Sequence, residues 1–442
     1  MKRAIIFSGL TFVGACAIAG EVNDTNVVTF QGGLPALASD VNANFDELII
    51  QINDNHNRIS DLEDAPSGGG GVVDLNVDCG SDPDALSAAL ANNVNATEIN
   101  IDLSGTCEPV YINRSRVSIV GPAIITSDAG GANPITVDGA NHVELVNLTL
   151  DAQGLAETAL SVQWDASVIV TDVTASGASG QTLDVIRGSL RLSGNNSFTA
   201  TGTPAAEVSG QSLVLVESGQ TDFVSDTDVM LLNNSAVVAN IAPSTMNISG
   251  TFMEINELSN LVVANGSVNV GSIQLNRAGV LNLDAAGSDV VTLTGNIQAI
   301  NNSVINLQSQ ENASITTTGN FVLASNTVVQ SAATGSSTIQ FGVGAGNLAS
   351  MNGGAQILVI GNTTYQFDNT FAQHGSLVRS LFGGNVASDS LFSISSSSIF
   401  AYDSGSTPIS QNNVTCGFQG TPIAGFAYVS GGAFVNLCDP AP

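Results

Sequence analysis

Two acidic residues occupy equivalent positions in consecutive repeats of this sequence. Asp184 is the middle residue of the triplet Leu-Asp-Val at 183, and Glu207 is the middle residue of Ala-Glu-Val at 206. If the triplets are neighbouring parallel strands, the two carboxyl groups lie roughly 5 Å apart. Retaining glycosidases separate their acid and their nucleophile by this distance. With Arg187, three residues after Asp184, the pair forms the best catalytic constellation in the sequence.

The same carboxylates also have a plainer interpretation. The chain has 38 acidic residues and a formal net charge of −29, and a charged column on such a chain is usually a solvated face. We therefore favour a non-catalytic interpretation and keep the enzymatic one as the alternative.

A repeat that runs through most of the chain positions these residues. Apolar–x–apolar triplets begin at residues 110, 135, 160, 183, 206, 229, 253, 273, 297 and 321, and a second apolar strand follows each of the first nine after a short turn. Such units cannot bury their apolar faces alone, so they must stack. Residues 110–344 are thus predicted to form about ten coils of a parallel β-helix, which fits the paired strands better than a β-sandwich of short strands.

Alternation within the strands predicts which side chains face outward. In the triplets these include Tyr111, Thr136, Ser161, Met230 and Glu254. In the second strands they form an apolar stripe interrupted by Arg191, whose members are Ile169, Val214, Val238 and Val262. An exposed stripe of this kind should be covered, either by the C-terminal region or by another protomer.

The front of the repeat resembles a known family. The stretch VDCGSDPDALSAALANNVNATEINIDLSGTCEPVYINRSRVSIVG (77–121) resembles the entry to a right-handed parallel β-helix of the pectin-lyase-like superfamily, and ITVDGANHVELVNLTLD (135–151) is similar to one of its coils. The resemblance implies an all-β fold in which Asp84–Asn93 is a helix that covers the open end of the core. Residues 72–109 would then be the N-terminal cap. After about residue 344 the repeat fades, and residues 345–442 are predicted to form a C-terminal cap region that blocks the open end of the solenoid.

The resemblance carries little information about activity, because the superfamily includes lyases, hydrolases and non-catalytic surface proteins. The catalytic motifs of pectate lyases and polygalacturonases are absent from this sequence. We therefore expect a secreted or cell-surface, adhesin-like protein that displays a rigid acidic rod to a glycan or other surface ligand. The alternative is a polysaccharide lyase or glycoside hydrolase that acts on a groove along the helix.

The N-terminus predicts export. Lys2 and Arg3 precede an apolar run and an Ala-Ile-Ala site, so residues 1–19 are predicted to be a signal peptide. The alternative is lipoprotein processing at Cys16, in a stretch that loosely resembles a lipobox. No other segment resembles a membrane span. The net acidity of the chain argues against nucleic acid as a partner.

Residues 20–64 contain about three heptads, and residues 65–71 are a glycine-rich linker. The seam of the heptads consists of Phe45, Leu48, Ile52, Asn55, Ile59 and Leu62. A lone helix of this length is marginally stable in water, so it is expected to self-associate. The asparagine in the seam resembles the layers of trimeric surface-fibre stalks, which favours a trimer. The alternative is a short amphipathic helix that lies on its own domain.

Cysteine and acidic clusters give the remaining candidates. Export favours disulfides, and proximity in sequence predicts the pairs Cys79–Cys107 and Cys416–Cys438. Asp222, Asp226 and Asp228 gather in one turn where calcium could bind. Their spacing matches no known calcium loop, so a solvated turn is preferred and no other cofactor is expected.

The heptads generate a test of assembly. Light scattering of the mature chain should give the mass of a trimer, and Asn55→Ile should raise the thermal midpoint, because the substitution removes a buried polar layer. A monomer at all concentrations, or an unchanged midpoint, would contradict the prediction of a coiled coil.

Overall fold

The structure is a computed structural model that describes residues 71–381, apart from 129, 153–157, 178–179 and 240–242. Beyond residue 381 it describes only short strands, and side chains are described up to residue 379. The predicted signal peptide, the Cys16 site, the heptad seam from Phe45 to Leu62 and most of the linker lie outside the described residues.

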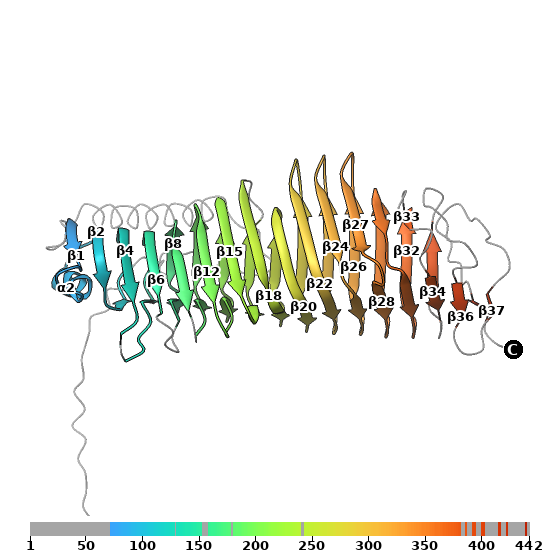
Figure 1. Ribbon diagram of the computed structural model, residues 1–442, viewed down its shortest axis with the longest axis horizontal. Helices are drawn as coiled ribbons and strands as arrows, with labels where there is room; N and C mark the ends of the chain where they lie inside the picture. The colour runs from blue at the N-terminus through green and yellow to red at the C-terminus, as the bar shows by residue number, and fades with distance from the viewer. Residues whose placement is uncertain are drawn as a thin grey trace, which may run out of the picture. The chain divides into compact units, whose positions relative to one another are not determined.

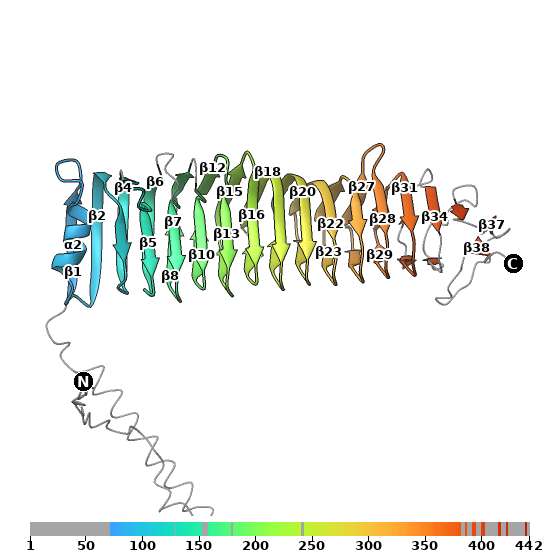
Figure 2. The same ribbon diagram turned by 90° about the horizontal axis from the view of Figure 1, so that it is seen from below.

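The described chain is a parallel β-solenoid of about 12 turns with one short helix. Figures 1 and 2 show its coils lying side by side, each strand paired with the equivalent strand of the next coil. Each full coil supplies strands to three faces, which we name the triplet face, the second face and the third face. The sequence predicted two strands per coil and missed the third, whose outward positions are mostly Thr, Ser and Asn.

The three faces are defined by their strands, and several long strands turn a corner and contribute to two faces. The triplet face comprises β3 (Val110–Ile112), β5 (Ile135–Asp138), β7 (Leu160–Gln163), β10 (Leu183–Ile186), β13 (Ala206–Ser209), β16 (Asp228–Asn233), the ends of β18 (Ser244–Asn256), β20 (Gly266–Asn276) and β22 (Val290–Ala299), β25 (Phe321–Leu323), β28 (Leu348–Met351), β31 (Asn369–Ala372), β34 (Leu391–Ile394) and β36 (Val414–Cys416). The second face comprises β1 (Val72–Asp78), the starts of β2 (Glu98–Cys107), β4 (Val117–Thr126) and β6 (Val143–Asp151), β8 (Ser167–Thr171), β11 (Ser189–Ser193), β14 (Leu213–Val216), β17 (Ala236–Ala239), β19 (Asn260–Val263), β21 (Val280–Ala285), β23 (Val304–Ser309), β26 (Val328–Ala333), β29 (Gln356–Gly361), β32 (Leu377–Leu381) and β35 (Ile399–Tyr402). The third face comprises the ends of β2, β4 and β6, β9 (Thr174–Gly177), β12 (Asn196–Ala200), β15 (Gly219–Ser225), the starts of β18, β20 and β22, β24 (Ser314–Thr318), β27 (Thr338–Val343), β30 (Thr363–Tyr365) and β33 (Asn385–Val386). A separate antiparallel pair joins β37 (Thr421–Pro422) to β38 (Cys438–Asp439).

Two outward assignments from the sequence are wrong. Met230 pairs with Ala206 and is fully buried, so Leu231 faces outward beside Glu207. A bulge between Asp228 and Met230 interrupts the pairing of the same strand with β18. Likewise Val214 is fully buried, and Leu215 is the residue that continues the outward column after Arg191. Both errors fall in continuous apolar runs, where no polar residue marks which side chains face outward.

The solenoid continues past residue 344, where the sequence placed its end. Strands from β28 to β36 extend the same parallel ladder. An aromatic cluster spans this boundary in the core, where Phe321, Phe341 and Phe367 pack edge to face at 5.0–5.2 Å. The repeat faded from the sequence because residue types and coil lengths change here, while the backbone register does not.

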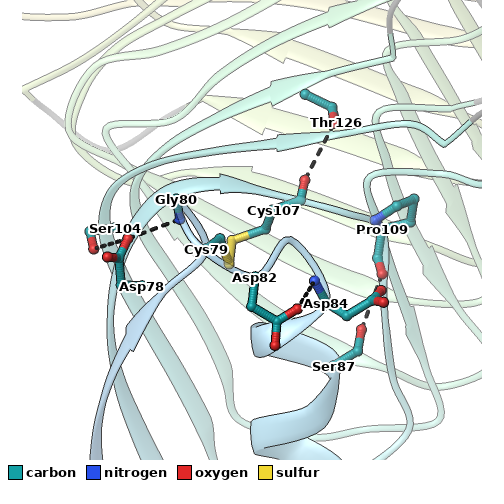
Figure 3. Close-up of a disulfide and its surroundings, with 10 residues drawn as sticks. All are labelled: Asp78, Cys79, Gly80, Asp82, Asp84, Ser87, Ser104, Cys107, Pro109 and Thr126. Carbon is teal, nitrogen blue, oxygen red and sulfur yellow. Dashed lines mark hydrogen bonds between the residues drawn. A yellow bond between two sulfur atoms is a disulfide. The ribbon is translucent and has the colours of Figure 1, made fainter.

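The N-terminal end of the core is covered as predicted by α2 (Ala85–Asn92), which buries Leu86 and Leu90. Arg114 holds the end of this helix by donating to the carbonyl oxygens of Asn93 and Ala96. The Cys79–Cys107 disulfide is confirmed and joins the loop before α2 to the end of β2, with the Cα atoms 5.0 Å apart (Figure 3). The side chains of Cys416 and Cys438 lie outside the described part of the chain, so their pairing stays a prediction.

The cap predicts a position-specific loss of stability. Leu86→Ala should lower the free energy of unfolding by about 3 kcal/mol, because it leaves a cavity over the first coil. The control is Val94→Ala in the following loop, where 67% of the side chain is exposed and the change should be under about 0.5 kcal/mol. Urea unfolding followed by circular dichroism measures both, and equal midpoints would show that α2 does not cover the core.

Candidate functional site

Asp184 and Glu207 occupy consecutive rungs of the triplet face. Asp184 on β10 is in register with Glu207 on β13 and with Ser161 on β7. Figure 2 shows β7, β10 and β13 side by side. Because neighbouring strands are about 4.8 Å apart and the two acidic residues occupy the same position of their strands, the two carboxyl groups are adjacent. The structure thus confirms the register on which the predicted carboxylate pair depends.

Asp184 is half-buried, and its pKa is raised to about 6 from an ordinary value of 3.8. The main cause is burial, which disfavours the charged form, and the nearby charge of Glu207 acts in the same direction. A hydrogen bond to Ser161 acts in the opposite direction. Asp184 therefore retains its proton at a higher pH than an exposed aspartate.

Glutamine side chains support both ends of this group. Gln163 donates through Nε2 to Ser161 Oγ at 2.6 Å, and Ser161 is fully buried. Gln181 donates through Nε2 to Glu207 Oε2 at 2.6 Å. The two carboxyl groups therefore have different hydrogen-bond partners, and unequal environments are what a pair acting as acid and nucleophile needs.

Arg187 is placed away from the pair. It occupies the turn after β10 with a positive φ of 52°, and its guanidinium carbon lies 5.3 Å from the centre of the Trp164 ring. Among the described residues, ion pairs join Arg191 to Glu217 and Arg277 to Glu257, and none joins Arg187 to Asp184 or Glu207. The predicted third member thus stacks on an exposed tryptophan, because the left-handed turn carries its side chain off the strand face.

The acidic cluster considered for calcium, for which a solvated turn is preferred, is spread over two elements and the bend between them. Asp222 on β15 accepts hydrogen bonds from Gln220 at 2.9 Å and from Asn247 at 2.8 Å. Asp226 accepts from the backbone N–H of Gly202 at 2.5 Å, and Asp228 begins β16. In the part of the chain with described side chains, no three His, Cys, Asp or Glu residues are grouped so that they could hold a metal ion. The preference for a solvated turn stays a prediction.

Sequence reasoning identified the two carboxylates but missed the residues that orient them. Ser161 was placed on the outward column without a role, and Gln163 and Gln181 were not singled out. Gln181 precedes its strand, where no periodic signal marks it. Only the register between coils shows that Gln181 bonds to Glu207 on the next coil rather than to Asp184, which is nearer in the sequence.

Comparison with protein-family models, with curated proteins and with solved structures found no match to this chain. Among the described residues, no helix has the length and apolarity needed to cross a membrane.

Burial of Asp184 predicts a pH dependence of stability. Between its ordinary pKa of 3.8 and about 6 the folded state binds more protons than the unfolded state, so stability falls as pH rises through this window. Asp184→Asn removes this loss. The measured quantity is the free energy of unfolding of wild type minus that of the variant. This difference should fall by about 1–2 kcal/mol between about pH 4 and about pH 7, after allowance for partial exposure.

Urea titrations at the two pH values measure this difference. Glu254→Gln is the matched control, because Glu254 lies on the same face between Leu231 and Gln274 rather than beside a carboxylate. A wild-type-minus-variant difference that does not change with pH would contradict the assignment of the raised pKa.

Proposed function

We propose that this chain is an exported, non-catalytic rod that presents a rigid acidic surface to an extracellular ligand, in the manner of an adhesin. The observation that carries the proposal is the unbroken parallel pairing from β1 to β36. Each coil contacts mainly its neighbours, so a solenoid keeps outward residues in fixed rows along its length. Such an object suits display, since its surface is extended and its backbone is fully paired.

Charge and termini support the same proposal. A net charge of −29 keeps such rods soluble and apart from one another and from anionic polymers. The signal-like residues 1–19 and the Cys79–Cys107 disulfide fit an oxidising destination outside the cytoplasm. The heptads of residues 20–64 would join copies into a stalk, as a trimer in the simplest case.

The second candidate function is polysaccharide cleavage on the triplet face. Its support is the adjacency of Asp184 and Glu207 together with the unequal environments of their carboxyl groups. In that case Asp184 would protonate the glycosidic oxygen and Glu207 would attack the anomeric carbon. The likeness of residues 77–151 to pectin-lyase-like proteins is compatible with both candidates.

Product analysis over a panel of neutral and acidic polysaccharides separates the two functions. For the rod we expect no new reducing ends or unsaturated products from wild type, and therefore no difference from Asp184→Asn or Glu207→Gln. Cleavage that both variants lose by roughly a hundredfold or more, and that Glu254→Gln retains, would overturn the non-catalytic proposal.

A further inference from the structure

The third face carries a compact array of uncharged polar side chains where β22, β24 and β27 pair, strands that lie in sequence along the solenoid in Figure 1. Three outward residues from each strand form a grid, which we name the hydroxyl grid. Its rows are Val290–Ser314–Thr338, Thr292–Thr316–Gln340 and Thr294–Thr318–Val343. The grid thus presents hydroxyl groups, one amide and two valines, and no charged side chain.

Most of these polar groups have no hydrogen-bond partner in the described part of the chain. Thr318 donates weakly to the carbonyl oxygen of Leu293 at 3.5 Å. Among the described residues, the side chains of Thr292, Thr294, Ser314, Thr316, Thr338 and Gln340 make no hydrogen bond, and all six are exposed or half-exposed. Each hydroxyl can both donate and accept, so the grid offers unused bonds of both kinds.

Neighbouring columns of polar side chains differ from the hydroxyl grid, because their members already form hydrogen bonds with one another. On the second face Asn306 donates to Asn282 at 2.8 Å, and Asn282 donates to Asn260 at 3.0 Å. Earlier on the third face Ser267 donates to Asn247 at 3.0 Å, and Asn247 donates to Asp222. These ladders stabilise the stack of coils, whereas the hydroxyl grid begins just where the second of them ends.

The strands that carry the grid are packed against the core on their inner side. The residues that alternate with it, including Val291, Leu293 and Ile315, are buried. Beneath β27, Phe341 packs edge-on against Phe321 and Phe367, each at 5.0 Å between ring centres. Threonine is stiff at χ1 in a strand, so little side-chain entropy would be lost when a ligand binds.

We infer that the hydroxyl grid binds an uncharged polysaccharide. The grid repeats at about 4.8 Å across the strands, close to the length of one sugar residue in an extended chain, and at about 6.7 Å along the strands. Sugar hydroxyls donate and accept as threonine hydroxyls do, and the exposed Val290 offers contact to the C–H face of a sugar ring. The strong net acidity of the chain disfavours a polyanion at the same place.

This inference deepens the proposed display function by naming the class of ligand and its location. It can fail separately, because the hydroxyl grid lies on a different face from Asp184 and Glu207. A chain that cleaves glycans on the triplet face could still bind on the third, and a non-catalytic rod could lack the grid's affinity.

The test is retention of the full mature chain on insoluble β-1,4-glucan and β-1,4-mannan, with polygalacturonate as the anionic comparison. We expect binding to at least one neutral polymer, insensitive to added salt because no ion pair is involved. Thr292→Val with Thr316→Val should weaken it roughly 10- to 30-fold, since two hydroxyl bonds are lost while shape is kept. Serine at both positions should restore it to within about threefold of wild type.

Thr149→Val with Thr174→Val is the matched control. These two threonines are also exposed neighbours on the third face, but the next outward residue after Thr149 is Asp151 rather than a residue with a hydroxyl group. Their substitution should leave binding unchanged. No retention on either neutral polymer, equal retention of the valine and wild-type proteins, or dimerisation that only the Thr292/Thr316 valine variant loses would overturn the inference.

Discussion

The structure depends on one constraint, which is that every coil must pair its backbone with the coil before it and the coil after it. A single unit buries too little apolar surface to fold alone, so the core exists only as a stack. The register is fixed residue by residue, as where Leu183, Asp184 and Val185 lie against Ala206, Glu207 and Val208. A site on the outer surface therefore consists of residues from successive coils that stand in one column, rather than of residues close together in the sequence.

The same constraint makes the ends of the stack the costly positions. An open end would expose core side chains and unpaired backbone groups, which invites edge-to-edge association. At the N-terminal end α2 covers the core, Arg114 binds the carbonyl groups at its C-terminus and the Cys79–Cys107 disulfide closes the adjoining loop. Helix, cation and disulfide thus act on one small region, where the repeat itself supplies no neighbour.

Prediction from sequence succeeded in the triplet strands and in most of the second strands, where polar and apolar residues alternate at regular spacing from coil to coil. The parallel solenoid, the helix over its end, one disulfide and the Asp184–Glu207 register all follow from spacing or from likeness to a known entry segment. Prediction failed at Met230 and Val214, where a continuous apolar run does not show which side chains face outward, in the strands of the third face, and after residue 344, where the lengths of the coils change. Arg187 could not be placed from spacing, because one left-handed turn residue redirects its side chain toward Trp164.

The three faces show how one backbone separates stability from recognition. Polar side chains that bond to the next coil, as Asn306 does to Asn282, strengthen the stack and have less capacity left for a ligand. Unpaired ones, as at Thr292 and Thr316, add little to the stack and remain available. A long acidic rod repels other anions over about 10 Å at moderate ionic strength, whereas an uncharged grid acts only at contact. If the grid binds a neutral polysaccharide as proposed, the selectivity would arise from the charge of the chain, which repels anionic polymers, and the affinity from the grid.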